Sequence, residues 1–327
     1  MRRNQLLAGI MTALTAVMPA VSVYVDTAAA SEILTSNETV QTETNIDKTT
    51  ALQNSVKLID MLSTEASGKN IMFSPTSLNF ALGMIAEGAK GETKEVLSAY
   101  LGTSDFASYA KEYLDKIQAY NTEDESYGYQ SKVKIADAVW MDDELTLQEK
   151  FKNTVSNSCG AEVEAVDFSA AEETCDIINS WCDKNTEGLI PKIITPDLIN
   201  DNTGLCLTNS LYFESGWSGE PWNVSDTEEK FGNNEKTKYM TCAGDRYYEN
   251  DKATAFARYY VNGLSFIGIL PKNEGDFTLE DLDIEGLLKS EPEYDEVQCK
   301  MPKLNFETSA TLNDMLSDLG LENIFSD

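Results

Sequence analysis

Helices are predicted in the first third of the chain, where apolar side chains return every three or four positions. The first helix covers residues 49–63 and buries one face. Its apolar positions are Leu52, Val56, Ile59 and Leu62. A short strand is expected at residues 70–73. Ser74 then supplies an N-cap and Pro75 a first-turn proline for a helix that runs to about residue 87. This helix is apolar on most sides, which predicts a central position.

Strands are predicted mainly in the second half of the chain. Two further helices are expected at 92–101 and 106–120 before the first long strand, and another at 170–185. Apolar or alternating runs predict strands at 133–141, 205–213, 247–261, 264–271 and 297–305, with a short helix at 311–319. No internal repeat and no Pro/Gly-rich linker follows residue 47. The pattern therefore predicts one α+β domain over residues 48–327.

The first thirty residues are typical of a signal peptide. Arg2 and Arg3 precede an apolar run over 6–25, and small residues Ala28–Ala30 end the segment. The alternative is an uncleaved membrane anchor, since the run is close to spanning length. Both interpretations predict export, and cleavage predicts a secreted, extracellular protein. Residues 31–47 are polar and aperiodic, which predicts a flexible linker.

The charge of the chain disfavours polyanionic partners. It carries 55 acidic and 25 basic residues, a formal net charge of −30. Such a charge repels nucleic-acid phosphates and anionic lipid headgroups, so neither nucleic acid nor a membrane surface is an expected partner. The simplest interpretation of the charge is solubility.

The absence of histidine excludes several kinds of site. Ser-His-Asp and Cys-His catalysis are impossible within a chain that has none. The six cysteines form no Cys-x-x-Cys pair, so neither a zinc site nor a dense disulfide framework is expected. Cys175 and Cys182 share a helix face but would lie about 10 Å apart, beyond disulfide reach. Buried free thiols are therefore expected, with no metal and no cofactor.

No enzyme motif is present in the sequence. There is no Walker loop, dinucleotide glycine fingerprint or calcium-binding loop. The chain is thus expected not to be an enzyme, with no catalytic residues. Two carboxylates could hydrolyse glycosides without histidine, so an acidic secreted hydrolase stays open as a remote alternative.

Five phrases resemble the serpin family, and they occur in the family's order. They are NIMFSPTSLNFALGMIAEGAKGET (70–93), INSWCDKNTEGLIPKII (178–194), LTNSLYFESGWSGEPW (207–222), NGLSFIGILP (262–271) and MPKLNFETSATLNDMLSDLGLENIF (301–325). The resemblance covers nearly everything from the first helix to Asp327. It implies the serpin fold, an α+β arrangement of three β-sheets with a large central sheet and surrounding helices.

The resemblance also implies roles for particular residues. Those expected in the shutter, beneath the middle of the central sheet, are Ser74, Pro75, Ser77 and Asn209. Those expected in the breach, at the top of that sheet, are Trp217 and Lys303. Relatives often have Phe-Lys-Gly where this chain has Phe-Glu-Ser at 213–215, a charge reversal expected to alter local pairing.

The implied function is inhibition of serine or cysteine endopeptidases. In serpins the target protease cuts a reactive loop, which then enters the central sheet, so the inhibitor needs no catalytic residues. The partner is therefore a protease, and a monomer is expected. The hinge, the reactive bond and the last strands are expected beyond Asp327, so we expect this chain alone to be an inactive, poorly stable fragment. The alternative is a non-inhibitory secreted binding protein of the same fold.

Overall fold

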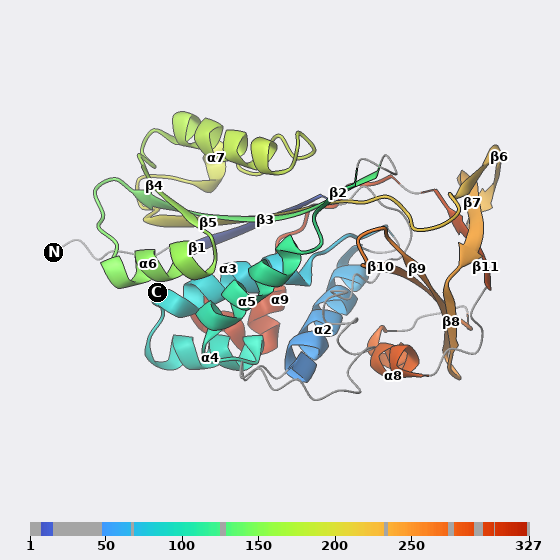
Figure 1. Ribbon diagram of the computed structural model, residues 1–327. Coiled ribbons are helices and arrows are strands. Elements are labelled where there is room, and N and C mark those ends of the chain that lie inside the picture. Colours follow the sequence, from blue (N-terminus) through green and yellow to red (C-terminus); the bar gives the residue numbers. More distant parts are fainter. Residues whose placement is uncertain are drawn as a thin grey trace.

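The computed structural model of the chain has three β-sheets surrounded by helices (Figure 1). It describes residues 8–15, 48–66, 69–124, 129–231, 235–273, 278–290, 297–303 and 305–325. This architecture confirms the α+β class predicted from the sequence. The predicted linker at 31–47 lies outside the described residues, and the division of the chain into leader, linker and domain stays a prediction.

The largest sheet has the order β1-β5-β3-β2, with β4 paired to β3. Its strands are β1 (Ala8–Thr15), β2 (Thr122–Asp124), β3 (Tyr129–Asp142), β4 (Glu162–Val166) and β5 (Leu205–Glu214). β5 is antiparallel to β3 and parallel to β1, whereas β4 is parallel to β3. β5 is therefore an inner strand with a partner on each edge.

Helices cover both faces of this sheet (Figure 1). On one face lies α7 (Ala171–Asn185), whose Ile178 and Trp181 pack on Trp140 of β3. The helices on the other face are α2 (Lys48–Ala66), α3 (Pro75–Gly88), α4 (Gly91–Leu101), α5 (Phe106–Gln118), α6 (Glu149–Ser158) and α9 (Asn313–Leu316).

The central position predicted for α3 is confirmed, since most of its residues are buried. Gly83 lets α3 approach α5 closely, because a Cβ there would lie 2.2 Å from the ring of Phe106.

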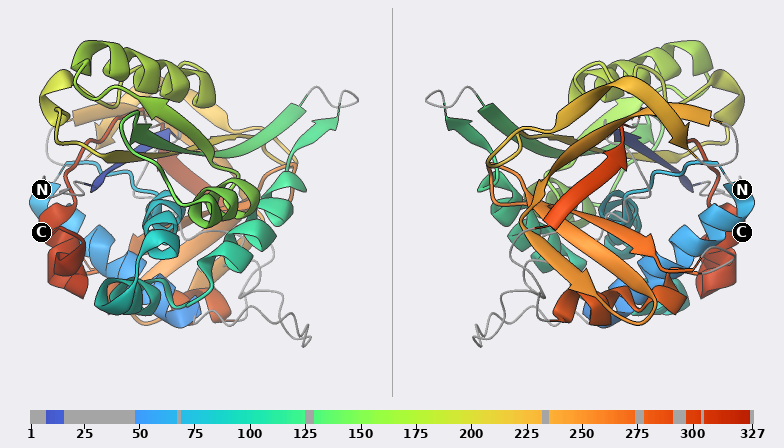
Figure 2. Two further views of the ribbon diagram at one scale, coloured as in Figure 1. Left: turned by 90° about the vertical axis from the view of Figure 1, so that its left-hand side faces the viewer. Right: turned by 90° about the vertical axis from the view of Figure 1, so that its right-hand side faces the viewer.

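Two smaller sheets lie at one end of the molecule (Figure 2, right). The first has the order β10-β9-β8, and the second β11-β7-β6. Their strands are β6 (Asn223–Phe231), β7 (Glu235–Gly244), β8 (Arg246–Glu249), β9 (Ala253–Tyr259), β10 (Ser265–Pro271) and β11 (Val297–Pro302). The helix α8 (Ile284–Lys289) packs on β8 and β9. Short non-α helical turns are η1 (Pro196–Leu198), η2 (Glu280–Leu282), η3 (Ser317–Leu321) and η4 (Glu322–Ile324).

Two local predictions were wrong. The predicted strand at 70–73 is an irregular segment, in which the Met72 N–H donates to the Thr308 hydroxyl at 3.1 Å. The single strand predicted at 247–261 is the hairpin of β8 and β9. Asn250 forms its turn, because its side-chain oxygen accepts hydrogen bonds from the backbone N–H groups of Lys252 and Ala253.

β1 lies inside the predicted signal peptide, so the proposed cleavage would remove a strand from the central sheet. The signal peptide itself stays a prediction. Among the described residues, no helix is both long and apolar enough to cross a membrane.

Candidate functional site

A buried polar pair lies in the middle of the central sheet. Asn209 of β5 and Asp137 of β3 are opposite each other in register, and the Asn209 Nδ2 donates to Asp137 Oδ1 at 2.9 Å. The cross-strand pair Val139 and Leu207, two residues away on each strand, belongs to the core shared with Phe80 of α3. Because strand side chains alternate between faces, Asp137 and Asn209 also point toward α3.

The pair is incompletely satisfied. Asp137 is 1% exposed and Asn209 0%, yet Asp137 Oδ2 and Asn209 Oδ1 have no hydrogen-bond partner among the described residues. Burial raises the pKa of Asp137 to about 7, with the Asn209 hydrogen bond acting in the opposite direction. An ionised Asp137 therefore weakens this part of the sheet, because its charge is held away from water.

The other predicted shutter residues form the beginning of α3. Ser74 is its N-cap, and the Ser74 hydroxyl accepts from the Ser77 N–H at 3.2 Å, while Pro75 opens the helix. Ser77 is 1% exposed and its own hydroxyl is unpartnered within the described structure. α3 packs against β5, but no described hydrogen bond joins its serines to Asn209. The shared role of these four residues as a shutter stays a prediction.

Trp217 anchors the segment that leaves β5. Its ring stacks on Tyr260, with 4.4 Å between the centroids and 20° between the planes, and Trp222 and Phe266 make edge contacts with it. The Val261 N–H donates to the Gly216 carbonyl at 2.9 Å. This aromatic cluster fastens the end of the central sheet to the β8–β10 sheet.

Lys303, the second predicted breach residue, follows β11 and lies beside β7. Its backbone N–H donates to the Lys238 carbonyl of β7 at 2.7 Å, and its side chain is exposed. Within the described part of the chain no ion pair involves Lys303. The breach roles of both residues stay predictions.

Sequence reasoning missed Asp137 as a site residue. A signal was available, because Asp137 is the only acidic residue in the apolar run of residues 133–141. An isolated carboxylate in a predicted buried strand points to a polar partner across the sheet. The identity of that partner required the register, since Asn209 is 72 positions further along the chain.

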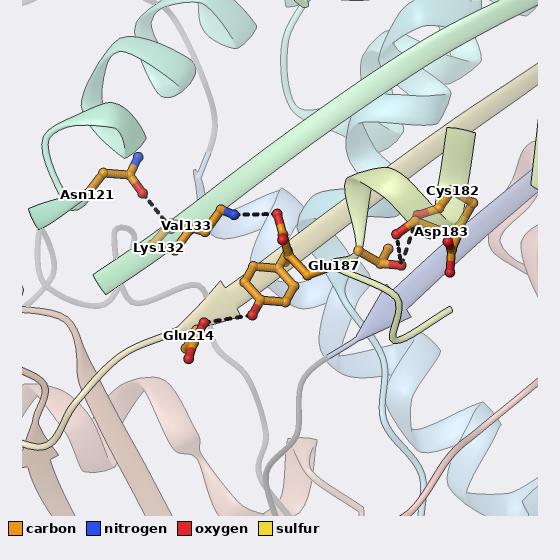
Figure 3. Close-up of polar contacts among 9 residues, drawn as sticks. Asn121, Lys132, Val133, Cys182, Asp183, Glu187 and Glu214 are labelled. Atoms are coloured by element: carbon orange, nitrogen blue, oxygen red, sulfur yellow. Dashed lines mark hydrogen bonds and ion pairs between the residues drawn. The ribbon is translucent and has the colours of Figure 1, made fainter. Parts of the chain in front are cut away.

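A second cluster of polar side chains, separate from the Asp137–Asn209 pair, lies near the end of β5 (Figure 3). Lys132 of β3 forms an ion pair with Glu187, which follows α7, and Lys132 also lies over the Tyr212 ring, 5.6 Å from its centroid. The Tyr212 hydroxyl donates to Glu214 at 2.7 Å. Glu214 stands where relatives often have lysine. It accepts the Tyr212 hydrogen bond, although the residue opposite it in the strand register is Lys132. No cluster that could hold a metal ion occurs among the described residues.

A chain with this fold and this site belongs to a family of protease inhibitors. Residues 50–327 match the family model described as Serpin (serine protease inhibitor). The chain is therefore a member of the serpin family, as its five phrases predicted. The family model is described as a protease inhibitor and a relative is named as one, so the chain belongs to an inhibitor family and not to an enzyme family, in agreement with the sequence analysis.

Relatives from distant organisms support this assignment. The chain is 31% identical to Serpin-ZXA of Oryza sativa subsp. japonica over 284 residues. This match covers 80% of this chain and 70% of the relative. The chain is also 28% identical to leukocyte elastase inhibitor A of Mus musculus over 291 residues. That match covers 83% of this chain and 76% of the relative.

Solved structures show the same fold. The native, stressed conformation of Arabidopsis AtSerpin1 matches with a TM-score of 0.69 at 26% identity, over 84% of this chain and 75% of the other. Emu (Dromaius novaehollandiae) ovalbumin matches with a TM-score of 0.72 over 85% of this chain and 78% of the other, but at 17% identity it informs on the fold alone.

Proposed function

We propose that this serpin is exported and inhibits serine or cysteine endopeptidases outside the cell. The protease would cut an exposed loop, and the cut loop would enter the central sheet as an additional strand and hold the protease in a distorted state. Addition of a strand to a sheet edge is a general recognition mode, and serpin loop insertion is an established example. The protease supplies the chemistry, so the absence of histidine is no obstacle.

The observation that carries the proposal is the second edge of β5. One edge pairs with β3, and the other holds β1 in a parallel ladder from Ala8↔Leu205 to Thr15↔Tyr212. β1 comes from the predicted signal peptide. If that segment is removed on export, β5 presents a row of backbone N–H and C=O groups that can receive a strand.

The polar pair beneath β5 supports the same proposal. Asn209 lies on β5, the strand whose other edge would receive the loop, so its side chain must tolerate a rearrangement of the sheet at low cost. Asp137 Oδ2 and Asn209 Oδ1 have no partner to lose in the described structure. A single side-chain hydrogen bond, at 2.9 Å, links the two residues across the strands. We therefore add Asp137 to the shutter predicted from Ser74, Pro75, Ser77 and Asn209.

Export is tested by the N-terminal sequence of the protein recovered outside the producing cells. The small residues at 28–30 predict that the secreted protein begins at Ser31. A chain that keeps Met1 and stays with the membrane would overturn the signal-peptide proposal and favour the anchor.

Inhibition is tested by incubating the protein recovered outside the producing cells with trypsin-like, chymotrypsin-like, elastase-like and papain-like proteases. We expect one of them to lose activity and to form a one-to-one adduct that survives SDS. The 327-residue chain is assayed beside it, and each protease incubated without the serpin serves as the control.

One result would contradict the proposal, and another would locate the reactive bond. Loop cleavage without adduct or loss of protease activity would favour the non-inhibitory binding protein. Inhibition by the 327-residue chain itself would show that the reactive bond lies within it.

A further inference from the structure

Two cysteines of the β11-β7-β6 sheet are opposite each other. Cys242 of β7 and Cys299 of β11 are direct partners in the antiparallel register. The next pair on the same face, Met240 and Met301, is buried in the main core. Directly opposed residues in antiparallel strands have Cα atoms roughly 4.5–5.5 Å apart, and disulfides use roughly 4.4–6.8 Å. The backbone therefore already has the spacing of a disulfide.

The two thiols also interact with each other. The Cys299 thiol donates to the Val297 carbonyl at 3.7 Å. The proximity of the two thiols lowers the pKa of Cys242 and, together with burial, raises that of Cys299. The other cysteines differ, since burial raises the pKa of both Cys182 and Cys206 to about 12. Cys242 is thus the thiol best prepared to form the nucleophilic thiolate.

A buried cation lies beside Cys242. Arg258 of β9 is 2% exposed, and its guanidinium donates to the carbonyls of Ala243, Ser218 and Glu220. These acceptors are uncharged, and the Arg258 Nε has no partner among the described residues. The positive charge lowers the pKa of Cys242, while the carboxylate of Asp245 opposes it. A thiolate at Cys242 would give Arg258 a negatively charged neighbour.

We infer that Cys242 and Cys299 form a dithiol site that reacts with small disulfides of the glutathione type and closes to a disulfide between β7 and β11. The Cys242 thiolate attacks one sulfur of the small disulfide, forms a mixed disulfide and releases one thiolate. Cys299 then loses its proton and attacks the Cys242 sulfur, which releases the second thiolate. The protein loses two electrons and two protons, and the small disulfide gains the electrons.

Access to the site comes through β11. β11 is at the edge of its sheet as far as the described residues extend, so local opening there can expose both sulfurs. Cys242 and Cys299 are 8% and 5% exposed, which predicts slow but measurable exchange. The closed disulfide would enclose β8, β9, β10 and α8 in one covalent loop and prevent β11 from leaving β7.

The experiment is to incubate the folded 327-residue chain with oxidised glutathione, alkylate the remaining thiols and map the peptides. We expect a mass loss of about 2 Da before alkylation and one cross-link, between Cys242 and Cys299. We also expect a melting temperature higher than that of the reduced chain by roughly 5–10 °C.

Three variants separate the steps. Cys299→Ser should stop at a glutathione adduct on Cys242, a gain of about 305 Da. Cys242→Ser should acquire no adduct at Cys299. Cys182→Ser, the control, removes a buried thiol of another core and should still form the cross-link.

The inference is wrong if the folded wild-type chain keeps all six thiols, or if cross-links join other cysteines as often. Since the wild-type peptide map decides this, the result does not depend on how well any variant folds.

Discussion

Replacing Asp137 by Asn removes a buried charge without changing the size of the side chain. The pKa of this carboxyl is raised from 3.8 to about 7 by burial, against the weaker effect of the Asn209 hydrogen bond. In the folded protein the acid is therefore protonated at pH values where the unfolded chain has already lost the proton. Folding binds a proton in the window between 3.8 and about 7.

The sign of the effect follows from this uptake. Because the folded state binds more protons, the free energy of unfolding falls as pH rises through the window and reaches its lower level above it. A separation of roughly three pH units between the folded and unfolded pKa, at about 1.36 kcal/mol for each, corresponds to about 4 kcal/mol. Asp137→Asn carries no such charge, so it should be more stable than wild type by up to about 4 kcal/mol at pH 8 and nearly equal to it at pH 4.

The measurement is the melting temperature of both proteins by circular dichroism from pH 4 to pH 8. The difference between Asp137→Asn and wild type should grow with pH to roughly 8 °C. Asp143→Asn, an exposed neighbour just past β3, controls for the loss of one acidic residue. A difference that stays constant across this pH range would refute the reasoning.

Two further substitutions test packing. Gly83→Ala would place a methyl group 2.2 Å from the Phe106 ring, so it should lower the free energy of unfolding in urea by about 1–3 kcal/mol. The control, Asn79→Ala on the same helix, should lower it by less. Equal losses would contradict the close approach of α3 and α5. Trp217→Ala loses the stack on Tyr260 and should lower the free energy of unfolding by about 3 kcal/mol, the low end for a tryptophan because the indole is only partly buried. An unchanged melting temperature would show that this ring does not fasten the two sheets together.

Local elements were predicted well where one physical signal dominated. Ser74 and Pro75 mark the start of α3 by capping alone, and the apolar character of that helix predicted its central position. The hairpin of β8 and β9 was missed, because its turn depends on the Asn250 side chain within an otherwise strand-like run. α6 was also missed, since Val155 is its only buried residue and apolar periodicity is therefore weak.

The sequence by itself determined the α+β class, the absence of histidine chemistry and the family, because these depend on residue identity and short-range spacing. Tertiary structure alone decided which side chains meet. Asp137 meets Asn209, and Cys242 meets Cys299, only because strands distant in the chain pair in one register, and a shift of one residue would turn each side chain to the other face. The pKa of Asp137 likewise results from burial under the whole sheet, which no local pattern encodes.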